Sequence, residues 1–257
     1  MNRHKVLIIG GGYASIRYVE SIIWDDSYEL TMCGTEIKKK TKDISAKYAL
    51  PYLKFSDLTK SNINQFDCII VALPCNIKLR YIKTIIDDFE YTNALIIEKP
   101  LTIDENEISN YQTLLSKLDK CAIVCQRDYF PELYSIPEAE CFNIIWPSYD
   151  NDAIFIKRNM LPHVLSWMIN IDNSISEIRM KSENTYVGKW RGRDFKIQFV
   201  ERTNSLCMMV NNKVYPDFQY RKFNKEIVKL VLSSDKNISS KSINRAIKVS
   251  NLLISLD

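Results

Sequence analysis

The sequence predicts an α/β protein in which a doubly wound parallel sheet comes first and a smaller domain with its own sheet follows. Two observations predict the parallel sheet. Short runs such as 6–9 and 67–73 are almost entirely apolar, and helix-compatible segments alternate with such runs to about residue 126, as expected for strands that helices cover on both faces. A third observation predicts the second sheet: apolar and polar residues alternate strictly over 195–199, which is typical of a half-solvated strand.

Length and composition are those of an ordinary globular protein. The 257 residues suffice for one large or two moderate domains, and 46% are hydrophobic and 26% charged. The net charge of +4 is mild, so we expect no nucleic-acid binding through Lys38–Lys40 or through Arg191 and Arg193. Seven cysteines without a CxxC pair predict a reducing compartment. Because no apolar run is long enough for a secretory signal or a membrane span, a cytoplasmic protein is expected.

A glycine turn follows the first predicted strand. Val6–Ile9 is an aliphatic run, Gly10, Gly11 and Gly12 come directly after it, and an apolar, helix-compatible segment follows. In a dinucleotide site the first glycine permits the turn, and the second lets the backbone approach a pyrophosphate at the helix N-terminus. Glycine turns also close strands that bind nothing, so both interpretations stay open. The expected phosphate-binding residues are Gly10, Gly12, Tyr13, Ala14 and the small residue Ser15.

The second predicted strand, 29–33, ends where an adenosine ribose would lie. An acidic residue usually holds the ribose hydroxyls at this place, but Gly34 and Thr35 come first here, followed by Glu36 and Lys38–Lys40. A small hydroxyl residue followed by lysines suits a ribose 2′-phosphate. We therefore expect NADP, with Gly34, Thr35 and Lys38 as cofactor-binding residues, and Glu36 keeps NAD open. The alternative for the lysines is a solvated helix start.

The middle of the first sheet follows in order. A helix-like piece at 45–49 precedes a short edge strand at 52–55, and 67–73 is an apolar strand that Pro74 closes. Asn76 is expected to start a helix, because apolar residues recur after it at helical spacing, at Leu79, Ile82, Ile85 and Ile86.

The strand 94–97 ends in Glu98-Lys99-Pro100. Thr102 and Glu105 then form a capping-box pattern for a helix that extends to about Leu118. Residues 121–125 complete the predicted parallel sheet as its sixth strand.

Four motifs occur in the order and spacing of the Gfo/Idh/MocA oxidoreductases, which the chain resembles over residues 1–131. They are Gly10-x-Gly12, Ala72-Leu73-Pro74, Glu98-Lys99-Pro100 and Gln126-Arg127-Asp128-Tyr129-Phe130-Pro131. The resemblance implies a Rossmann domain, here residues 1–126. It also implies an α+β domain with an open, mostly antiparallel sheet, here residues 127–257 with the final helix packing back. In the family this open sheet is often a dimer or tetramer interface, so a homo-oligomer as well as a monomer is considered.

The resemblance further implies hydride transfer between NAD(P) and a sugar, an inositol or a sugar nucleotide. It places Lys99 near the nicotinamide and the reacting carbon, and it assigns the neighbouring strand-end residues Leu73, Pro74, Asn76 and Glu98 to the cofactor. The family often has an asparagine directly after the proline and a histidine further on. This chain has Cys75, Asn76 and Lys78 there, which leaves the substrate more open than the cofactor.

The chemistry of hydride transfer asks for a residue such as Lys99 independently. Transfer to a carbonyl needs a proton donor for the oxygen, and the reverse reaction needs a base. Lys99 follows a parallel strand at its carboxyl end, where ligands bind in such sheets, and partial desolvation would lower the pKa of its amine toward the working pH. Glu98 is expected to orient Lys99 or to contact the cofactor. The alternative is that both are surface charges before a proline turn.

The second domain is predicted to begin with a strand at 139–146 and a helix at 158–169 that carries His163. The resemblance implies an Asp-x-x-x-His pattern on this helix, facing the nicotinamide. Here Asn159 replaces the acid and His163 is kept, so the side chain of Asn159 is limited to hydrogen bonding. We expect His163 to act in catalysis or, with Asn159, in substrate binding. The alternative is a core histidine with a satisfied hydrogen bond.

The remaining sequence predicts a strand meander at 175–180, 183–190, 194–200 and 205–210, with a hairpin turn at Asn211-Asn212. A final helix is predicted at 242–256. Two histidines and scattered cysteines provide no metal-ligand cluster, so no metal site is expected.

Two functions are compatible with these residues. The first is an NAD(P)-dependent oxidoreductase that transfers a hydride between the nicotinamide and a carbonyl, alcohol or imine carbon of a small substrate, with a sugar or nucleotide sugar implied by the resemblance. Lys99 is then the proton donor or acceptor, His163 assists, and Arg127 and Tyr129 line the substrate side. The second is a dinucleotide-binding sensor or accessory protein without turnover, which Asn159 and the short second domain favour.

Overall fold

The computed structural model describes residues 3–35, 39–125, 136, 139–201, 208–215, 220–234 and 236–256. The chain divides into two compact units, and each is described by itself. The first consists of Met1–Val124 with Gln219–Asn244, and the second of Cys125–Phe218 with Arg245–Asp257. The expected division into separate domains 1–126 and 127–257 stays a prediction.

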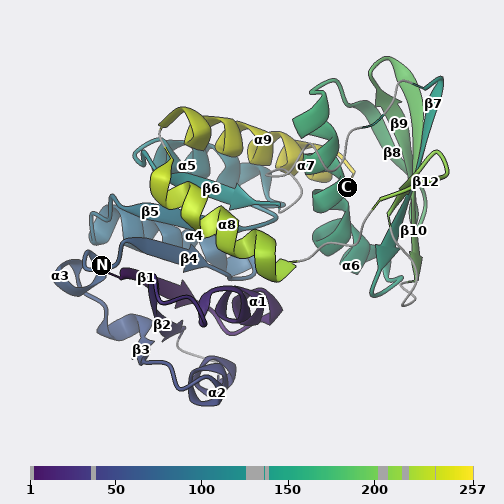
Figure 1. Ribbon diagram of the computed structural model, residues 1–257. Helices are drawn as coiled ribbons and strands as arrows, with labels where there is room; N and C mark the ends of the chain where they lie inside the picture. The colour runs from purple at the N-terminus through teal and green to yellow at the C-terminus, as the bar shows by residue number, and fades with distance from the viewer. Residues whose placement is uncertain are drawn as a thin grey trace. The chain divides into compact units, whose positions relative to one another are not determined.

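The first unit contains a parallel sheet of six strands in the order β3-β2-β1-β4-β5-β6 (Figure 1). In the middle strands β1, β4 and β5 the apolar residues are buried on both faces, which explains their continuous apolar sequences. The doubly wound sheet expected from the sequence is confirmed. Its strands are β1 (His4–Ile9), β2 (Tyr28–Gly34), β3 (Tyr52–Lys54), β4 (Cys68–Val71), β5 (Ala94–Glu98) and β6 (Cys121–Val124).

Helices connect these strands on both faces of the sheet. The chain moves from β1 toward one edge and from β4 toward the other, so right-handed crossovers place the two sets of connecting helices on opposite faces. The helices are α1 (Tyr13–Ile22), α2 (Lys39–Lys47), α3 (Lys60–Ile63), α4 (Cys75–Lys83) with a π-helical continuation (Thr84–Asp88), and α5 (Glu105–Leu115); a 3-10 turn (Phe55–Asp57) follows β3.

Two helices from the end of the chain are α8 (Tyr220–Ser233) and α9 (Lys236–Ile254). Helix α8 and the part of α9 up to Asn244 belong to the first unit, and the rest of α9 belongs to the second. Helix α8 packs against α1 and β5, and the Lys225 ammonium on α8 lies 2.6 Å from the Asp25 carboxylate. The hydrogen bond from Lys225 lowers the pKa of Asp25 to about 2. The sequence pattern predicts most of α9, as the expected helix 242–256, but not α8.

Helix α9 protects the edge strand β6. The Ser239 hydroxyl accepts a hydrogen bond of 2.8 Å from the Cys121 amide, and the Ser242 hydroxyl accepts one of 3.0 Å from the Ile123 amide. Both serines are buried. Their hydroxyls therefore take the place of a further strand, which removes free amides from an edge that would otherwise be open to pairing.

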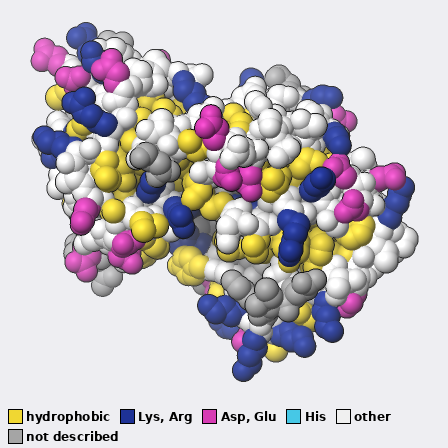
Figure 2. All heavy atoms as spheres, turned by 180° about the vertical axis from the view of Figure 1, so that it is seen from behind, with side chains coloured by type: hydrophobic (Ala, Val, Ile, Leu, Met, Phe, Trp, Pro, Cys, Tyr) yellow, Lys and Arg dark blue, Asp and Glu magenta, His cyan; other side chains and the backbone are white. Residues whose placement is uncertain are grey.

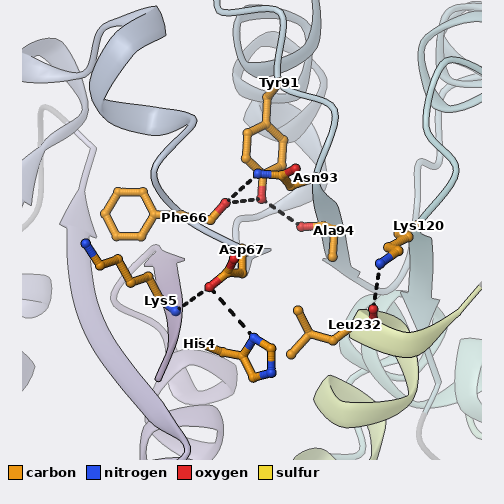
Figure 3. A network of polar contacts seen from close by, with 9 residues as sticks. All are labelled: His4, Lys5, Phe66, Asp67, Tyr91, Asn93, Ala94, Lys120 and Leu232. Atoms are coloured by element: carbon orange, nitrogen blue, oxygen red, sulfur yellow. Dashed lines mark hydrogen bonds and ion pairs between the residues drawn. The ribbon is translucent and has the colours of Figure 1, made fainter. Parts of the chain in front are cut away.

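A polar network ties the loops at the amino-terminal edge of the sheet (Figure 3). The Lys5 amide donates to the Asp67 carboxylate at 2.8 Å, and His4 Nδ1 lies 3.7 Å from the same carboxylate. The buried Tyr91 hydroxyl donates to the carbonyls of Phe66 and Ala94 at 3.2 and 3.1 Å. These contacts fix the starts of β1, β4 and β5, at the edge opposite the carboxyl ends of the strands.

Two local predictions are wrong in position. Helix α2 begins at Lys39 and not at residue 45, so Lys39 and Lys40 form its exposed first turn. Helix α5 is capped by Asp104, whose carboxylate accepts from the Asn106 amide at 2.9 Å, and not by a box from Thr102. The Thr102 hydroxyl instead donates to the Glu107 carboxylate at 2.6 Å.

The second unit contains a six-stranded sheet in the order β12-β11-β7-β10-β9-β8. Strands β7 and β10 pair in parallel and the other neighbours are antiparallel, so the expected mostly antiparallel sheet is confirmed. Its elements are β7 (Cys141–Ser148), α6 (Ala153–Phe155), a π-helical turn (Ile156–Met160), α7 (Leu161–Ile171), β8 (Ser176–Ser182), β9 (Thr185–Trp190), β10 (Arg193–Glu201), β11 (Met209–Val210) and β12 (Lys213–Val214).

Aromatic side chains form the core between α7 and this sheet. Trp167 on α7 lies between Trp146 of β7 and Trp190 of β9, with ring centroids 6.2 and 6.4 Å apart. All three are buried. The predicted hairpin turn at Asn211-Asn212 is confirmed: both residues have positive φ, as a two-residue hairpin requires. Within the described ranges, no helix is both long and apolar enough to span a bilayer.

The serine cover of β6 makes a prediction about stability. Ser242→Ala leaves the buried Ile123 amide without its acceptor, and we expect it to lower the free energy of unfolding by about 1–3 kcal/mol. Ser240→Ala is the matched control, because Ser240 is an exposed serine on the same helix, and it should change stability by less than about 0.5 kcal/mol. Chemical denaturation measures both, and equal effects would contradict the role assigned to Ser242.

Candidate cofactor site and active site

The glycine turn after β1 is packed between the ends of the two neighbouring strands. Gly10 has a φ of +121°, and a side chain at this position would collide with the Ala72 carbonyl oxygen just after β4. The Gly10 amide donates to the Cys33 carbonyl of β2 at 3.0 Å, and the Ala72 amide donates to the Ile9 carbonyl at 2.9 Å. Gly10 is therefore required by both its backbone conformation and the close approach of β4.

Gly12 is exposed, and the turn opens at this residue. A Cβ atom added there would meet no atom within 4 Å. Gly12 is the N-cap of α1, which has no side-chain cap and no acidic residue in its first turn. The helix start thus offers backbone amides and the positive end of the helix dipole without a capping side chain, the arrangement that binds phosphate.

The other predicted residues of this turn differ in exposure. Ser15 is fully buried, in the third small position of the motif. Tyr13 is 63% exposed, and the Arg17 guanidinium stacks on its ring at 4.2 Å from the centroid. Ala14 is half-buried. The residues present at α1 therefore fit a dinucleotide phosphate.

The end of β2 has no acidic side chain among the described residues. A side chain at Gly34 would collide with the Tyr52 hydroxyl. The Tyr52 ring, from edge strand β3, therefore occupies the space beside Gly34. Thr35 is half-buried. Lys38 lies outside the described residues, as does Glu36, and the exposed first turn of α2 agrees with the solvated-helix alternative for Lys39 and Lys40.

The ends of β4 and β5 carry the second group of predicted residues. Leu73 is buried, while Pro74 and Asn76 are exposed at the start of α4, which begins at Cys75. Glu98 is only 7% exposed, so it is not a surface charge. Burial raises the pKa of Glu98, and Lys99, Lys78 and a hydrogen bond from the Tyr18 hydroxyl act against that rise.

Lys99 directly follows β5 and is half-buried. The peptide bond between Lys99 and Pro100 is cis. Strands β1, β4 and β5 are adjacent and parallel. Lys99 therefore lies at the same edge of the sheet as the glycine turn. This is the edge at which parallel α/β sheets bind ligands, at the point where the strand order reverses.

Sequence reasoning missed the structural importance of Lys78. It expects Leu79 on the buried face of α4, but Leu79 is half-exposed and Lys78 is completely buried. The Lys78 ammonium donates to the carbonyls of Glu98 and Pro100, both at 2.5 Å. Burial lowers the pKa of Lys78 to about 8. The one sequence signal for the burial of Lys78 is its position on the apolar face of the predicted helix.

In the second unit, His163 differs from its neighbours. Residues 160–162 and 164–169 are buried, whereas His163 is half-exposed. Asn159, four residues earlier in the π-helical turn, is half-exposed as well. Arg127 and Tyr129, the other predicted substrate-binding residues, lie outside the described residues.

A pocket of about 460 Å³ lies on the open face of the second sheet. Its walls include Cys141 and Asn143 of β7, Arg179 of β8, Lys189 of β9 and Lys196 of β10. None of the described residues predicted for the active site lines it. On the face of the molecule drawn in Figure 2, Lys and Arg side chains are interspersed with Asp and Glu. The homo-oligomer interface expected on the open sheet stays a prediction.

Solved structures with the same fold include several dehydrogenases. Myo-inositol dehydrogenase from Corynebacterium glutamicum aligns with a TM-score of 0.68 and 12% identity over 98% of this chain and 94% of that one. Scyllo-inositol dehydrogenase from Lactobacillus casei has a TM-score of 0.70 and 10% identity over 99% and 96%. GenD2 from gentamicin A biosynthesis, solved with NAD, has a TM-score of 0.70 and 11% identity over 100% and 93%. At these identities the likeness establishes the fold.

No curated protein matches the chain in sequence. A family model does: residues 4–126 match the oxidoreductase family with an NAD-binding Rossmann fold. The matched segment contains the glycine turn, the ends of β4 and β5, and Lys99. Over this segment, residues 4–126, the chain is similar to the Gfo/Idh/MocA family of NAD-binding oxidoreductases.

Proposed function

We propose that this protein is an NAD(P)-dependent dehydrogenase that acts on a small sugar-like substrate, with Lys99 as its proton donor or acceptor. One observation carries the proposal: the uncapped glycine turn and Lys99 lie at the same edge of one parallel sheet, after strands β1 and β5, which β4 separates. When bound, the dinucleotide supplies or accepts a hydride. The chain must then bind its phosphates and move a proton at the substrate oxygen.

The cofactor-binding residues fall into two groups. At α1, Gly10 shapes the turn, Gly12 leaves room for the pyrophosphate, and the amides of Tyr13, Ala14 and Ser15 face it at the helix start. At the ends of β4 and β5, the residues proposed to flank the nicotinamide are Leu73, Pro74, Asn76 and Glu98. Burial raises the pKa of Glu98, and Lys99 and Lys78 act against that rise.

The proton moves between Lys99 and the reacting oxygen. In the direction of reduction, the carbonyl carbon gains the hydride, the electron pair of the C=O bond moves to oxygen, and the ammonium of Lys99 gives that oxygen a proton. In oxidation the neutral amine of Lys99 removes the hydroxyl proton. His163 and Asn159 are proposed to bind the substrate, with His163 also assisting the proton transfer; Asn159 contributes hydrogen bonds only.

The substrate class rests on the family and on the inositol dehydrogenases and GenD2 that share the fold. A panel of inositols, aldoses and nucleotide sugars is assayed at 340 nm with NADP⁺ and NAD⁺ for oxidation, and ketoses and other carbonyl compounds are assayed with NADPH and NADH for reduction. The panel identifies the substrate and the preferred cofactor. An imine acceptor belongs in the same panel. Dinucleotide binding without turnover of any compound would favour a sensor or accessory protein.

The two glycines are expected to respond differently to alanine. Gly12→Ala has room for its methyl group, so the protein should stay folded with a change in stability of about 1 kcal/mol or less. It should weaken NADPH binding about tenfold or more, because one charge-assisted hydrogen bond to the phosphate is lost. Gly10→Ala should instead lower stability by about 2 kcal/mol or more, through its positive φ and the collision with Ala72. Thermal melts and NADPH fluorescence titration measure the two effects; unchanged binding by Gly12→Ala would contradict the phosphate site.

The preference for NADP is tested at Lys38. We propose that Thr35 and Lys38 bind the ribose 2′-phosphate. Lys38→Gln should weaken NADPH binding about fivefold, the size expected for roughly 1 kcal/mol, and leave NADH binding unchanged. Lys47→Gln, at the exposed far end of α2, is the control. If Lys38→Gln binds NADPH and NADH as tightly as the native protein does, Lys38 does not bind the 2′-phosphate, and NAD becomes the favoured cofactor.

Lys99 is tested by removal of its charge. Lys99→Met should reduce kcat about 100-fold or more, the usual contribution of a general acid or base, and should keep dinucleotide binding within about threefold. Lys83→Met, an exposed lysine on α4, should change neither. Initial rates and fluorescence titration provide the two readouts, and full activity of Lys99→Met would rule out its catalytic role.

A further inference from the structure

We propose that Lys78 is a positioning residue that holds the backbone on both sides of Lys99 and thereby fixes the direction of the Lys99 side chain. The proposal rests on the catalytic role proposed above for Lys99. It assigns a function to a buried charge that neither the hydride transfer nor the cofactor site uses.

Both hydrogen bonds of the Lys78 ammonium go to one short backbone segment, the residues on either side of Lys99. Its ammonium reaches from α4 and donates to the carbonyl oxygens of Glu98 and Pro100, at 2.5 Å in both cases. These carbonyls belong to the residues immediately before and after Lys99. One cation therefore bridges the backbone of the residue whose side chain carries the chemistry, and two of its three donors are used there.

Stability alone does not account for a lysine at this place. The Lys78 side chain is completely buried, and a buried ammonium pays a desolvation cost that its partners only partly offset. The titratable groups that face it are Cys75 on its own helix, Glu98 and Lys99 at the end of β5, and Glu107 on α5. Apolar residues commonly replace buried ion pairs with no loss of stability. The desolvation cost of the Lys78 ammonium is explained if its two hydrogen bonds to carbonyls hold the backbone of the active site in place.

The contacts also suggest which kinetic quantity depends on Lys78. The phosphate turn is built from β1, α1 and the Ala72 carbonyl, so the phosphate contacts of the cofactor do not require Lys78. The direction of the Lys99 side chain does, because both hydrogen bonds anchor its backbone. Small displacements of a catalytic group reduce the rate strongly. Loss of Lys78 should therefore lower kcat and leave the KM and the NADPH affinity nearly unchanged.

The test compares Lys78→Met, which keeps the length of the side chain without its charge, with the control Lys83→Met. The lysines of each protein are reductively methylated with ¹³C-formaldehyde, and the Lys99 resonance is assigned by its loss in Lys99→Arg. In the native protein this resonance should shift when NADPH is added. In Lys78→Met we expect an altered chemical shift and loss of at least half of the NADPH-induced shift, with NADPH affinity within threefold. For any substrate that the panel identifies, kcat should fall at least tenfold and KM should change less than twofold.

The outcomes separate the two proposals. If the Lys99 resonance in Lys78→Met matches that of the native protein, with the same response to NADPH, the positioning role is wrong and the catalytic proposal is untouched. If the native resonance does not respond to NADPH at all, the proposed site itself fails. Lys78→Gln, which keeps two N–H donors without the charge, is measured in the same way and replaces Lys78→Met if that variant does not fold; it should retain part of the NADPH-induced shift.

The charge of Lys78 has its own readout. Its pKa of about 8 lies below the ordinary value of 10.5, so between these pH values the unfolded chain binds a proton that the folded protein does not. The native protein should therefore gain stability relative to Lys78→Met as the pH rises from 8 to 10.5. A constant stability difference across this window would show that folding does not shift the pKa of Lys78, which would contradict the desolvation cost on which the argument for a functional role depends.

Discussion

The candidate site depends on one close approach, that of Gly10 to the carbonyl of Ala72. The turn after β1 passes so near the end of β4 that no side chain fits between them. This contact fixes the start of α1 at the place where the order of the parallel strands reverses. The uncapped amides of α1 and the end of β5 then open to the same edge of the sheet, so backbone geometry places the proposed phosphate site and Lys99 at one edge.

The rest of the first unit stabilises this arrangement from outside the site. At the amino-terminal edge, Asp67 and Tyr91 tie the strand starts together. At the β6 edge, two serines of α9 satisfy the free amides. The buried cation of Lys78 is different, because it lies beneath the reactive segment and is costly in free energy. Its two hydrogen bonds concentrate rigidity at Lys99, where the proposed chemistry requires an accurately held group.

Much of the first unit could be predicted from the sequence, because strands buried on both faces are continuous apolar runs and the glycine turn has a definite pattern. Two features of the first unit could not be predicted, because both depend on contacts between segments that are distant in sequence. Lys78 was overlooked because a charged residue normally marks the exposed face of a helix, and only the carbonyls of Glu98 and Pro100 reverse that expectation. Helix α8 was missed although Ile227, Val228 and Val231 have helical spacing. Its partner α1 lies some two hundred residues earlier in the chain, and sequence patterns do not reveal such pairings.

A crystal structure of the protein with NADP⁺ tests the central claim most directly. The predicted result places the pyrophosphate oxygens within hydrogen-bond distance of the backbone amides at the start of α1, next to Gly12, with C4 of the nicotinamide beside the Lys99 ammonium. A dinucleotide bound away from α1, or a nicotinamide ring out of reach of Lys99, would contradict both the cofactor site and the catalytic role.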